Sequence, residues 1–175
     1  NEKCAVDILN QISFSVPQSK PDKLIKIPLA NLFFDHSMNM HGFITPNNSA
    51  YKKFVTELNQ KIAIISNDQK FYKYTYGIKG LKLSDVGKIT SSDSFYICPL
   101  AAADCPERRQ SLPNILEVVE KIENTLIIIV TDLFLTTDDL VSKNINKIID
   151  PLSVALSRGD TIGIYGIRSE FTGSI

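Results

Sequence analysis

The stretch LANLFFDHSMNMHGF, residues 29–43, decides the fold. Its first six residues form a predominantly apolar run without polar alternation, and a second run of this kind, TLIIIV, spans residues 125–130. Strands that are covered by helices on both faces have this composition, whereas half-exposed strands alternate apolar and polar residues. Both runs are therefore predicted to be central, parallel strands. The side chains expected to be almost fully buried are Leu32, Phe34, Ile128 and Val130.

Segments with helical and strand periodicity alternate along the rest of the chain. Apolar residues at helical spacing follow the turn signal TPNNS at 45–49 and predict a helix over 50–65. A second helix is predicted over 112–122, with Ser111 as its N-cap, because a serine hydroxyl can accept a hydrogen bond from the free amides of a first turn. The remaining predicted elements are a strand at 70–77, a helix from about Thr137 to Gly159 that bends at Pro151, and a last core strand at 161–167.

This alternation of strands and helices predicts an α/β fold with a doubly wound, mainly parallel central sheet and helices on both faces. Sheets of this kind bind ligands at the carboxyl ends of their strands. Asp35 and Asp132 directly follow the two apolar runs, so the fold would bring them together although they are far apart in the chain. Residues 27–175 are predicted to form the domain, and residues 1–26 an N-terminal extension or edge strand.

Composition and charge narrow the function classes. Of the 175 residues, 43% are hydrophobic, which is enough for one domain with a sizeable core. The 19 basic residues balance 19 acidic ones, so no global charge favours nucleic acid or an anionic membrane surface. No apolar stretch reaches the ~18 residues of a membrane span, and no signal peptide is recognised. The three cysteines lack metal-finger spacing, and both a Cys98–Cys105 bridge and idle thiols remain open.

The segment LFFDHSMNMHGFI resembles the first strand and metal loop of von Willebrand factor type A domains. The pattern of that family is an aspartate, any residue, a serine, any residue and a second serine. Methionine commonly follows, and glycine and an aromatic residue follow in some bacterial members. The residues that fit this pattern are Asp35, Ser37, Met40, Gly42 and Phe43. Asn39 departs from it, because it occupies the place of the second serine.

Two later segments extend the resemblance over nearly the whole predicted domain. IIIVTDLF is similar to the strand and aspartate that complete the metal site of this family, which points to Asp132. IYGIRSEFTG is similar to the last strand and exit loop of the bacterial branch. The family also has a threonine ligand, and Ser111 is the residue assigned to its role here.

The resemblance implies a metal-ion-dependent adhesion site for magnesium or manganese. Magnesium prefers six oxygen ligands and keeps several waters. Ser37 and Asn39, at alternate positions of a turn, would contact the ion, and Asp35 and Asp132 would hold coordinated waters. One coordination position would stay open for an acidic side chain of a protein partner. The resemblance therefore implies a bacterial binding module that is secreted or lies in the cell envelope, and that is not an enzyme.

Three alternatives accompany this interpretation. Asp35 and Ser37 could simply cap the turn after the strand, since short polar side chains often bond neighbouring backbone groups. His36 and His41 could hold zinc, although packing or exposed histidines are favoured because no cysteine is near. The rival function is a haloacid dehalogenase-type phosphatase with Asp35 as nucleophile. That chemistry needs a second aspartate two residues on as general acid, and Ser37 stands there.

Overall fold

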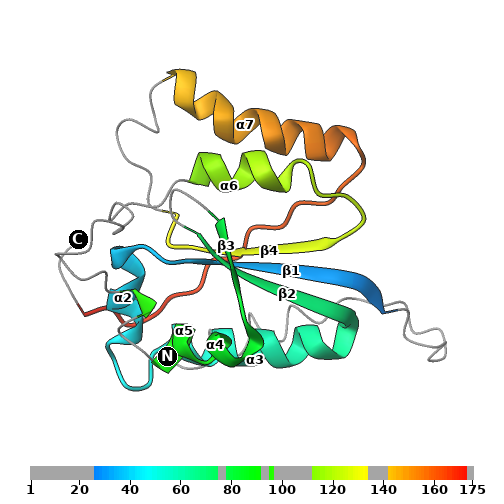
Figure 1. The fold of residues 1–175 in the computed structure, drawn as a ribbon. Coiled ribbons are helices and arrows are strands. Elements are labelled where there is room, and N and C mark those ends of the chain that lie inside the picture. The colour runs from blue at the N-terminus through cyan, green and yellow to red at the C-terminus, as the bar shows by residue number, and fades with distance from the viewer. Residues whose placement is uncertain (1–25, 75–77, 92–94, 97–111, 134–141, 173–175) are drawn as a thin grey trace.

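The computed structural model describes residues 26–74, 78–91, 95–96, 112–133 and 142–172. These residues form three layers, with a twisted sheet between helix α3 (Ala50–Ile65) on one face and helices α6 (Leu112–Val119) and α7 (Ser142–Ser157) on the other (Figure 1). The predicted α/β class with helices on both faces is confirmed. No helix in the described part of the chain is long and apolar enough to cross a membrane.

Within the described residues, the sheet has four strands in the order β3-β2-β1-β4. Strand β1 (Ile27–Asp35) pairs in parallel with β2 (Ser66–Tyr74) on one side and with β4 (Leu126–Val130) on the other. Strand β3 (Ile78–Leu81) is antiparallel to β2. The sheet is thus small and mixed, and the prediction of a mainly parallel sheet was wrong. Only residues 75–77 separate β2 from β3, and a parallel connection needs a dozen residues or more.

The part of the core that the structure describes has two clusters, one on each face of the sheet. The cluster on the α3 side contains Leu32, Phe34 and Val130 with Val55 and Ile62 of α3. The cluster on the opposite side contains Phe33 with Ile115 and Leu116 of α6. Burial of Leu32, Phe34 and Val130 is as predicted, but Ile128 is only partly buried. The reason is position, because β4 is the last strand on its side of the described sheet.

The long helices agree with the helical periodicity of the sequence. The predicted helix over 50–65 is α3, and its N-cap Ser49 accepts a hydrogen bond from the Lys52 amide at 3.3 Å. Helix α6 begins as predicted but ends at Val119. Helix α7 contains Pro151 and ends at Ser157, before Gly159 with φ of 90°. The start predicted near Thr137 and the predicted N-cap Ser111 lie outside the described residues.

Three short helices were not predicted from the sequence. Helix α2 (Met38–Ile44) follows β1, where a turn was expected, and α4 (Leu83–Val86) and α5 (Lys88–Ser91) follow β3. Strand β2 starts at Ser66, four residues before the predicted strand. Because α2 begins one residue after Ser37, the polar residues of this region lie on the first turn of a helix rather than on an open loop.

The C-terminal segment 160–172 differs most from the prediction. It was expected to contain a core strand at 161–167, yet these residues form neither strand nor helix. Ile164 is 81% exposed and Tyr165 is 70% exposed. The segment leaves the end of α7 and runs back across the molecule. It ends beside α2 (Figure 1). The prediction failed because its apolar residues make no sheet pairing in the described chain.

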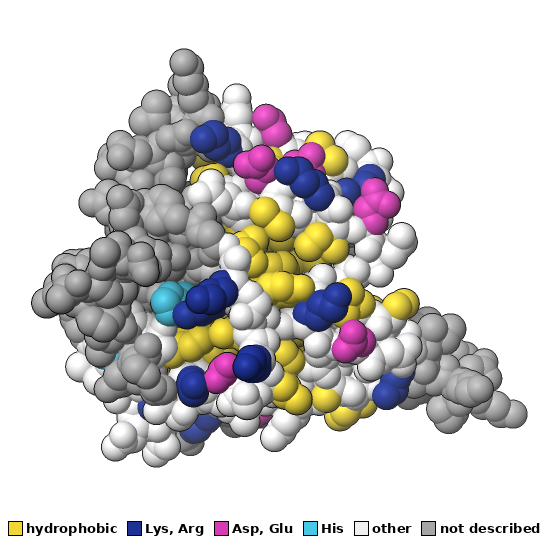
Figure 2. All heavy atoms as spheres, in the orientation of Figure 1, with side chains coloured by type: hydrophobic (Ala, Val, Ile, Leu, Met, Phe, Trp, Pro, Cys, Tyr) yellow, Lys and Arg dark blue, Asp and Glu magenta, His cyan; other side chains and the backbone are white. Residues whose placement is uncertain are grey.

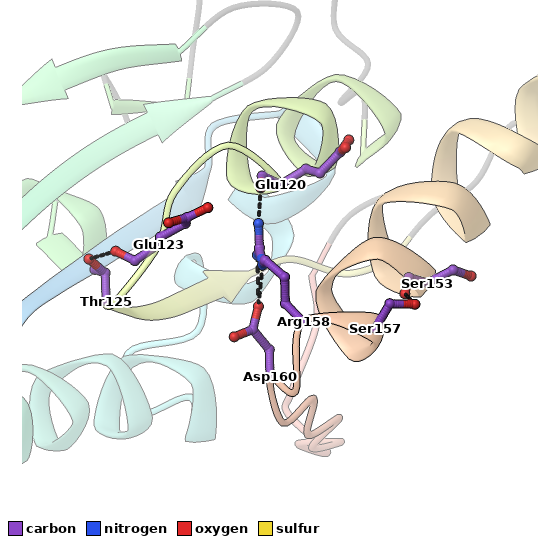
Figure 3. Close-up of polar contacts among 7 residues, drawn as sticks. All are labelled: Glu120, Glu123, Thr125, Ser153, Ser157, Arg158 and Asp160. Carbon is purple, nitrogen blue, oxygen red and sulfur yellow. Dashed lines mark hydrogen bonds and ion pairs between the residues drawn. The ribbon is translucent and has the colours of Figure 1, made fainter.

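The chain just before this segment is fixed to the residue that follows α6 through Arg158. The Arg158 guanidinium donates to the backbone carbonyl of Glu120 and forms an ion pair with Asp160 at 2.7 Å (Figure 3). Figure 2 shows the face of the molecule that is seen in Figure 1. Hydrophobic side chains reach the surface there, between the two helical layers, and Lys and Arg side chains border them.

Candidate functional site

The carboxyl ends of three neighbouring strands lie close together at one end of the sheet. Asp35 is the last residue of β1 and lies in register with Tyr74, the last residue of β2. Phe34 lies in register with Val130, so Thr131 and Asp132 follow β4 at the same edge. Asp35 and Asp132 therefore lie at the same end of the sheet, because β1 and β4 pair in parallel.

The Asp35 carboxylate is buried and held by two hydrogen bonds. Its exposed fraction is 0%, and its Oδ1 accepts a hydrogen bond from the Ser37 amide at 2.7 Å. Its Oδ2 accepts one from the Thr131 hydroxyl at 3.1 Å. The bond to Ser37 is the local turn contact that short acidic side chains commonly make. The bond from Thr131 is not local, because it joins the ends of two strands.

The charge of Asp35 is costly in this position. Burial raises the pKa of Asp35 to about 7, and the nearby negative charge of Asp132 acts in the same direction. The hydrogen bonds from Ser37 and Thr131 oppose this rise. Burial also raises the pKa of Tyr74, and the charges of Asp35 and Asp132 add to that effect. The site is thus a region of low polarity in which two carboxylates lie close enough to interact.

Ser37 has a buried hydroxyl that makes no hydrogen bond of normal geometry in the described structure, although it lies close enough to Asp35 to lower the pKa of that carboxyl. The residue is 1% exposed, and it is the N-cap of α2, although its side chain makes no capping hydrogen bond. Buried hydroxyls are almost always satisfied, and an exception calls for an explanation such as a water or an ion. Ser37 Oγ is the clearest sign in this structure of a ligand position.

The other predicted ligands are placed less fully. Asn39 is half-buried and lies on the first turn of α2, two residues after Ser37. Asp132 is half-buried and close enough to Asp35 to raise its pKa. Ser111 lies outside the described residues.

His36 is a packing residue, as the sequence favoured. Its ring contacts Phe95 edge-on with 5.0 Å between centroids and also faces Tyr96. Its backbone amide donates to the Tyr74 carbonyl at 3.0 Å. Burial lowers the pKa of His36 to about 4, and the charge of Lys73 contributes to that decrease. A neutral ring packed between aromatic side chains accounts for this histidine without zinc.

Two residues of the site were missed by sequence reasoning. Thr131 bonds Asp35 across the strand ends, and its Oγ1 also accepts the Leu133 amide at 3.1 Å. Leu133 has φ of 54°, which a leucine rarely adopts, and its side chain is 52% exposed. The only available signal was the place of Thr131 directly after an apolar run, and the strained conformation of Leu133 has no signal in the sequence.

The donor set consists of oxygens. Within the described residues, no group of three or more His, Cys, Asp or Glu side chains is placed to hold a metal ion. The candidate site instead combines two carboxylates with hydroxyl and amide oxygens, which suit a hard cation rather than zinc. Comparisons with protein-family models, with curated proteins and with solved structures find no match to this chain.

Proposed function

We propose that this protein is a binding module of the von Willebrand type A kind, whose magnesium or manganese site captures a carboxylate of a partner protein. The observation that carries the proposal is the hydroxyl of Ser37, which is 1% exposed, lies beside the buried carboxylate of Asp35 and makes no hydrogen bond of normal geometry. Two acidic residues alone would not support a metal site, because carboxylates at strand ends often accept hydrogen bonds from backbone amides of the following turn. A buried hydroxyl that makes no such hydrogen bond supports a ligand position in addition.

The residues present fit a hydrated divalent cation. Ser37 and Asn39 would contact the ion directly, and Asp35 and Asp132 would hold its waters, with Ser111 proposed as a further ligand. Carboxylates that act through water neutralise the ion only partly, so the ion keeps an affinity for an incoming anionic ligand. A glutamate or aspartate of the partner would complete the octahedron. We place such a module in the bacterial cell envelope or among secreted proteins.

Catalysis by the same residues is less well supported. A phosphatase nucleophile at Asp35 would need a general acid two residues on, and Ser37 offers a hydroxyl there. Asp35 is also fully buried in this structure. Turnover of an aryl phosphate that is lost in Asp35→Ala would replace the proposed function by the phosphatase.

The first test is isothermal titration with Mg²⁺ and Mn²⁺ of the wild type, Asp35→Ala and Asn39→Ser. Heat of binding is expected for the wild type and is lost in Asp35→Ala, which stays folded because removing one carboxylate also relieves repulsion between the pair. Asn39→Ser restores the pattern of the resembled family and should bind the ion more tightly. Heat from Asn39→Ser alone would mean that the site is lost in the natural protein.

A pair of serine variants separates binding from stability. Ser37→Ala removes a buried hydroxyl that makes no hydrogen bond of normal geometry, so the folded state should lose little stability, but metal binding should disappear. Ser66→Ala is the matched control, because Ser66 is 3% exposed and its hydroxyl donates to the Ile62 carbonyl at 2.7 Å. Ser66 begins β2, roughly 26 Å of strand away from the site. Its variant should lose stability and keep the metal; unchanged metal binding in Ser37→Ala would refute the proposed ligand.

A further inference from the structure

The C-terminal residues Ser169–Thr172 attach the chain to α2 and α3 after a long exposed stretch. Residues 160–168 are all exposed, whereas Ser169 and Phe171 are half-buried. The Thr172 amide donates to the Gly42 carbonyl of α2 at 2.9 Å. The attachment therefore begins at α3 and ends at α2, the helix that follows Asp35.

Two side chains of this segment complete the N-terminus of α3. The first amides of a helix have no partner within the helix and need one from outside. Glu170 Oε2 accepts the Ala50 amide and Ser169 Oγ accepts the Tyr51 amide, both at 2.9 Å, while the helix's own N-cap Ser49 accepts the Lys52 amide. Two of these three acceptors come from residues more than a hundred positions away in the chain. The contact to Ala50 also holds the pKa of Glu170 below its ordinary value.

Gly42 provides the space into which Phe171 fits. A Cβ atom at Gly42 would overlap the Phe171 ring, so no other residue type fits at this position without movement. The Phe171 ring also meets Phe43 edge-on, with 5.0 Å between centroids, and Phe43 in turn faces Tyr51 at 6.1 Å. The ring contacts and the backbone hydrogen bond thus act on α2, and the capping bonds act on α3.

We propose that Ser169–Thr172 form a latch that fixes α2 against α3 and thereby positions Ser37 and Asn39 for the metal. Ser37 is the N-cap of α2 and Asn39 lies in its first turn, so a shift of this seven-residue helix would move both oxygens relative to Asp35. A helix this short does not hold its place without tertiary contacts. The latch residues are positioning residues, and their role in metal binding rests on the proposed function.

The experiment compares Phe171→Ala with Tyr165→Ala. The second variant removes an exposed ring from the stretch that precedes the latch. Phe171→Ala should weaken Mg²⁺ binding in calorimetry by about tenfold, the size seen when supporting contacts around metal ligands are lost. It should also speed hydrogen exchange of the α2 amides. Tyr165→Ala should change neither quantity. Equal behaviour of the two variants in both measurements would overturn the latch.

In Gly42→Ala, the direction in which the hydrogen-exchange rate of the α2 amides changes shows whether the latch exists. Alanine favours a helix over glycine, so without a latch Gly42→Ala should slow exchange in α2. With the latch it should speed exchange, because the new methyl group displaces Phe171. In the Phe171→Ala background the methyl group has room, and Gly42→Ala should then slow exchange. Slower exchange in both backgrounds would refute the latch.

The hydrogen-exchange measurement needs no metal, so the two proposals can fail separately. If the wild type binds no Mg²⁺ but Phe171→Ala and Gly42→Ala still loosen α2, the proposed function fails and the latch stands as a device that positions α2. If the wild type binds Mg²⁺ and both variants bind it equally well, the latch fails and the metal site stands.

Discussion

Strands β1 and β4 lie side by side and run in the same direction, yet their environments differ sharply. Ala30, Leu32 and Phe34 of β1 are 0% exposed. Leu126 to Ile129 of β4 are half-buried, and only Val130 is fully buried, at 9% exposed. Side chains on both faces of each strand pack into the two core clusters, so the faces do not explain the contrast. The difference arises at the strand edges, because β1 has a neighbour on each side and β4 pairs with β1 alone in the described sheet.

The largest expected effect is a stability difference between Leu32→Ala and Ile128→Ala. The two residues are register partners and belong to the same core region. Leu32→Ala should lower the free energy of unfolding by about 3–5 kcal/mol, as for a fully buried leucine, and Ile128→Ala by about 2 kcal/mol. Urea-induced unfolding of both variants measures this. Equal losses would mean that the open edge of β4 is covered in solution.

The next effect concerns the carboxyl end of β1 and its dependence on pH. The folded state keeps a proton on Asp35 up to a pKa of about 7, whereas the unfolded chain releases it near 3.8. The wild type should therefore lose stability as pH rises from about 4 to about 7, by up to about 4 kcal/mol relative to Asp35→Asn.

His36 has the opposite sign, because its pKa is lowered to about 4 and the unfolded chain binds its proton up to 6.5. Its contribution is present in both proteins and cancels in the comparison. Thermal unfolding across this pH range, without divalent metal, is the measurement. A stability difference that does not change with pH would show that Asp35 titrates as an exposed carboxyl group does.

A smaller effect, this time an increase in the free energy of unfolding, is expected for a substitution within β1. Asn31 is 4% exposed, and its Oδ1 has no hydrogen-bond partner in the described structure. Its register partner in β4 is the apolar Ile127. Asn31→Val should raise the free energy of unfolding by about 1 kcal/mol, because it removes an unsatisfied polar atom from the core. Destabilisation by this variant, measured in urea, would indicate that Asn31 is satisfied in solution by a water or another group.

The smallest effect tests whether residues 161–167 are as exposed in solution as they are in this structure. Tyr165 is 70% exposed, so Tyr165→Ser should change the free energy of unfolding by less than about 0.5 kcal/mol. A loss of 2 kcal/mol or more would show that residues 161–167 pack onto the sheet in solution, and would remove the contrast between β1 and β4.

Part of the candidate site could be read from the sequence. An acidic residue directly after an apolar run indicates the end of a buried strand. Because Asp35 and Asp132 both follow such runs, the sequence predicts that they lie together at the carboxyl ends of the strands. The hydrogen bond from Thr131 to Asp35 could not be predicted, because it depends on the register of two strands far apart in the chain.

The sequence by itself indicated that residues 29–34 and 125–130 belong to strands of an α/β sheet and where the long helices lie. Periodicity of apolar residues records the faces of an element, and local capping residues record its ends. Only the tertiary structure decided that β4 is an edge strand, that β3 returns antiparallel, that residues 161–167 are unpaired, and that Ser169–Thr172 hold α2 and α3. Lateral pairing and long-range caps leave no periodic trace, because they depend on which distant segments meet and not on the order of residues within one.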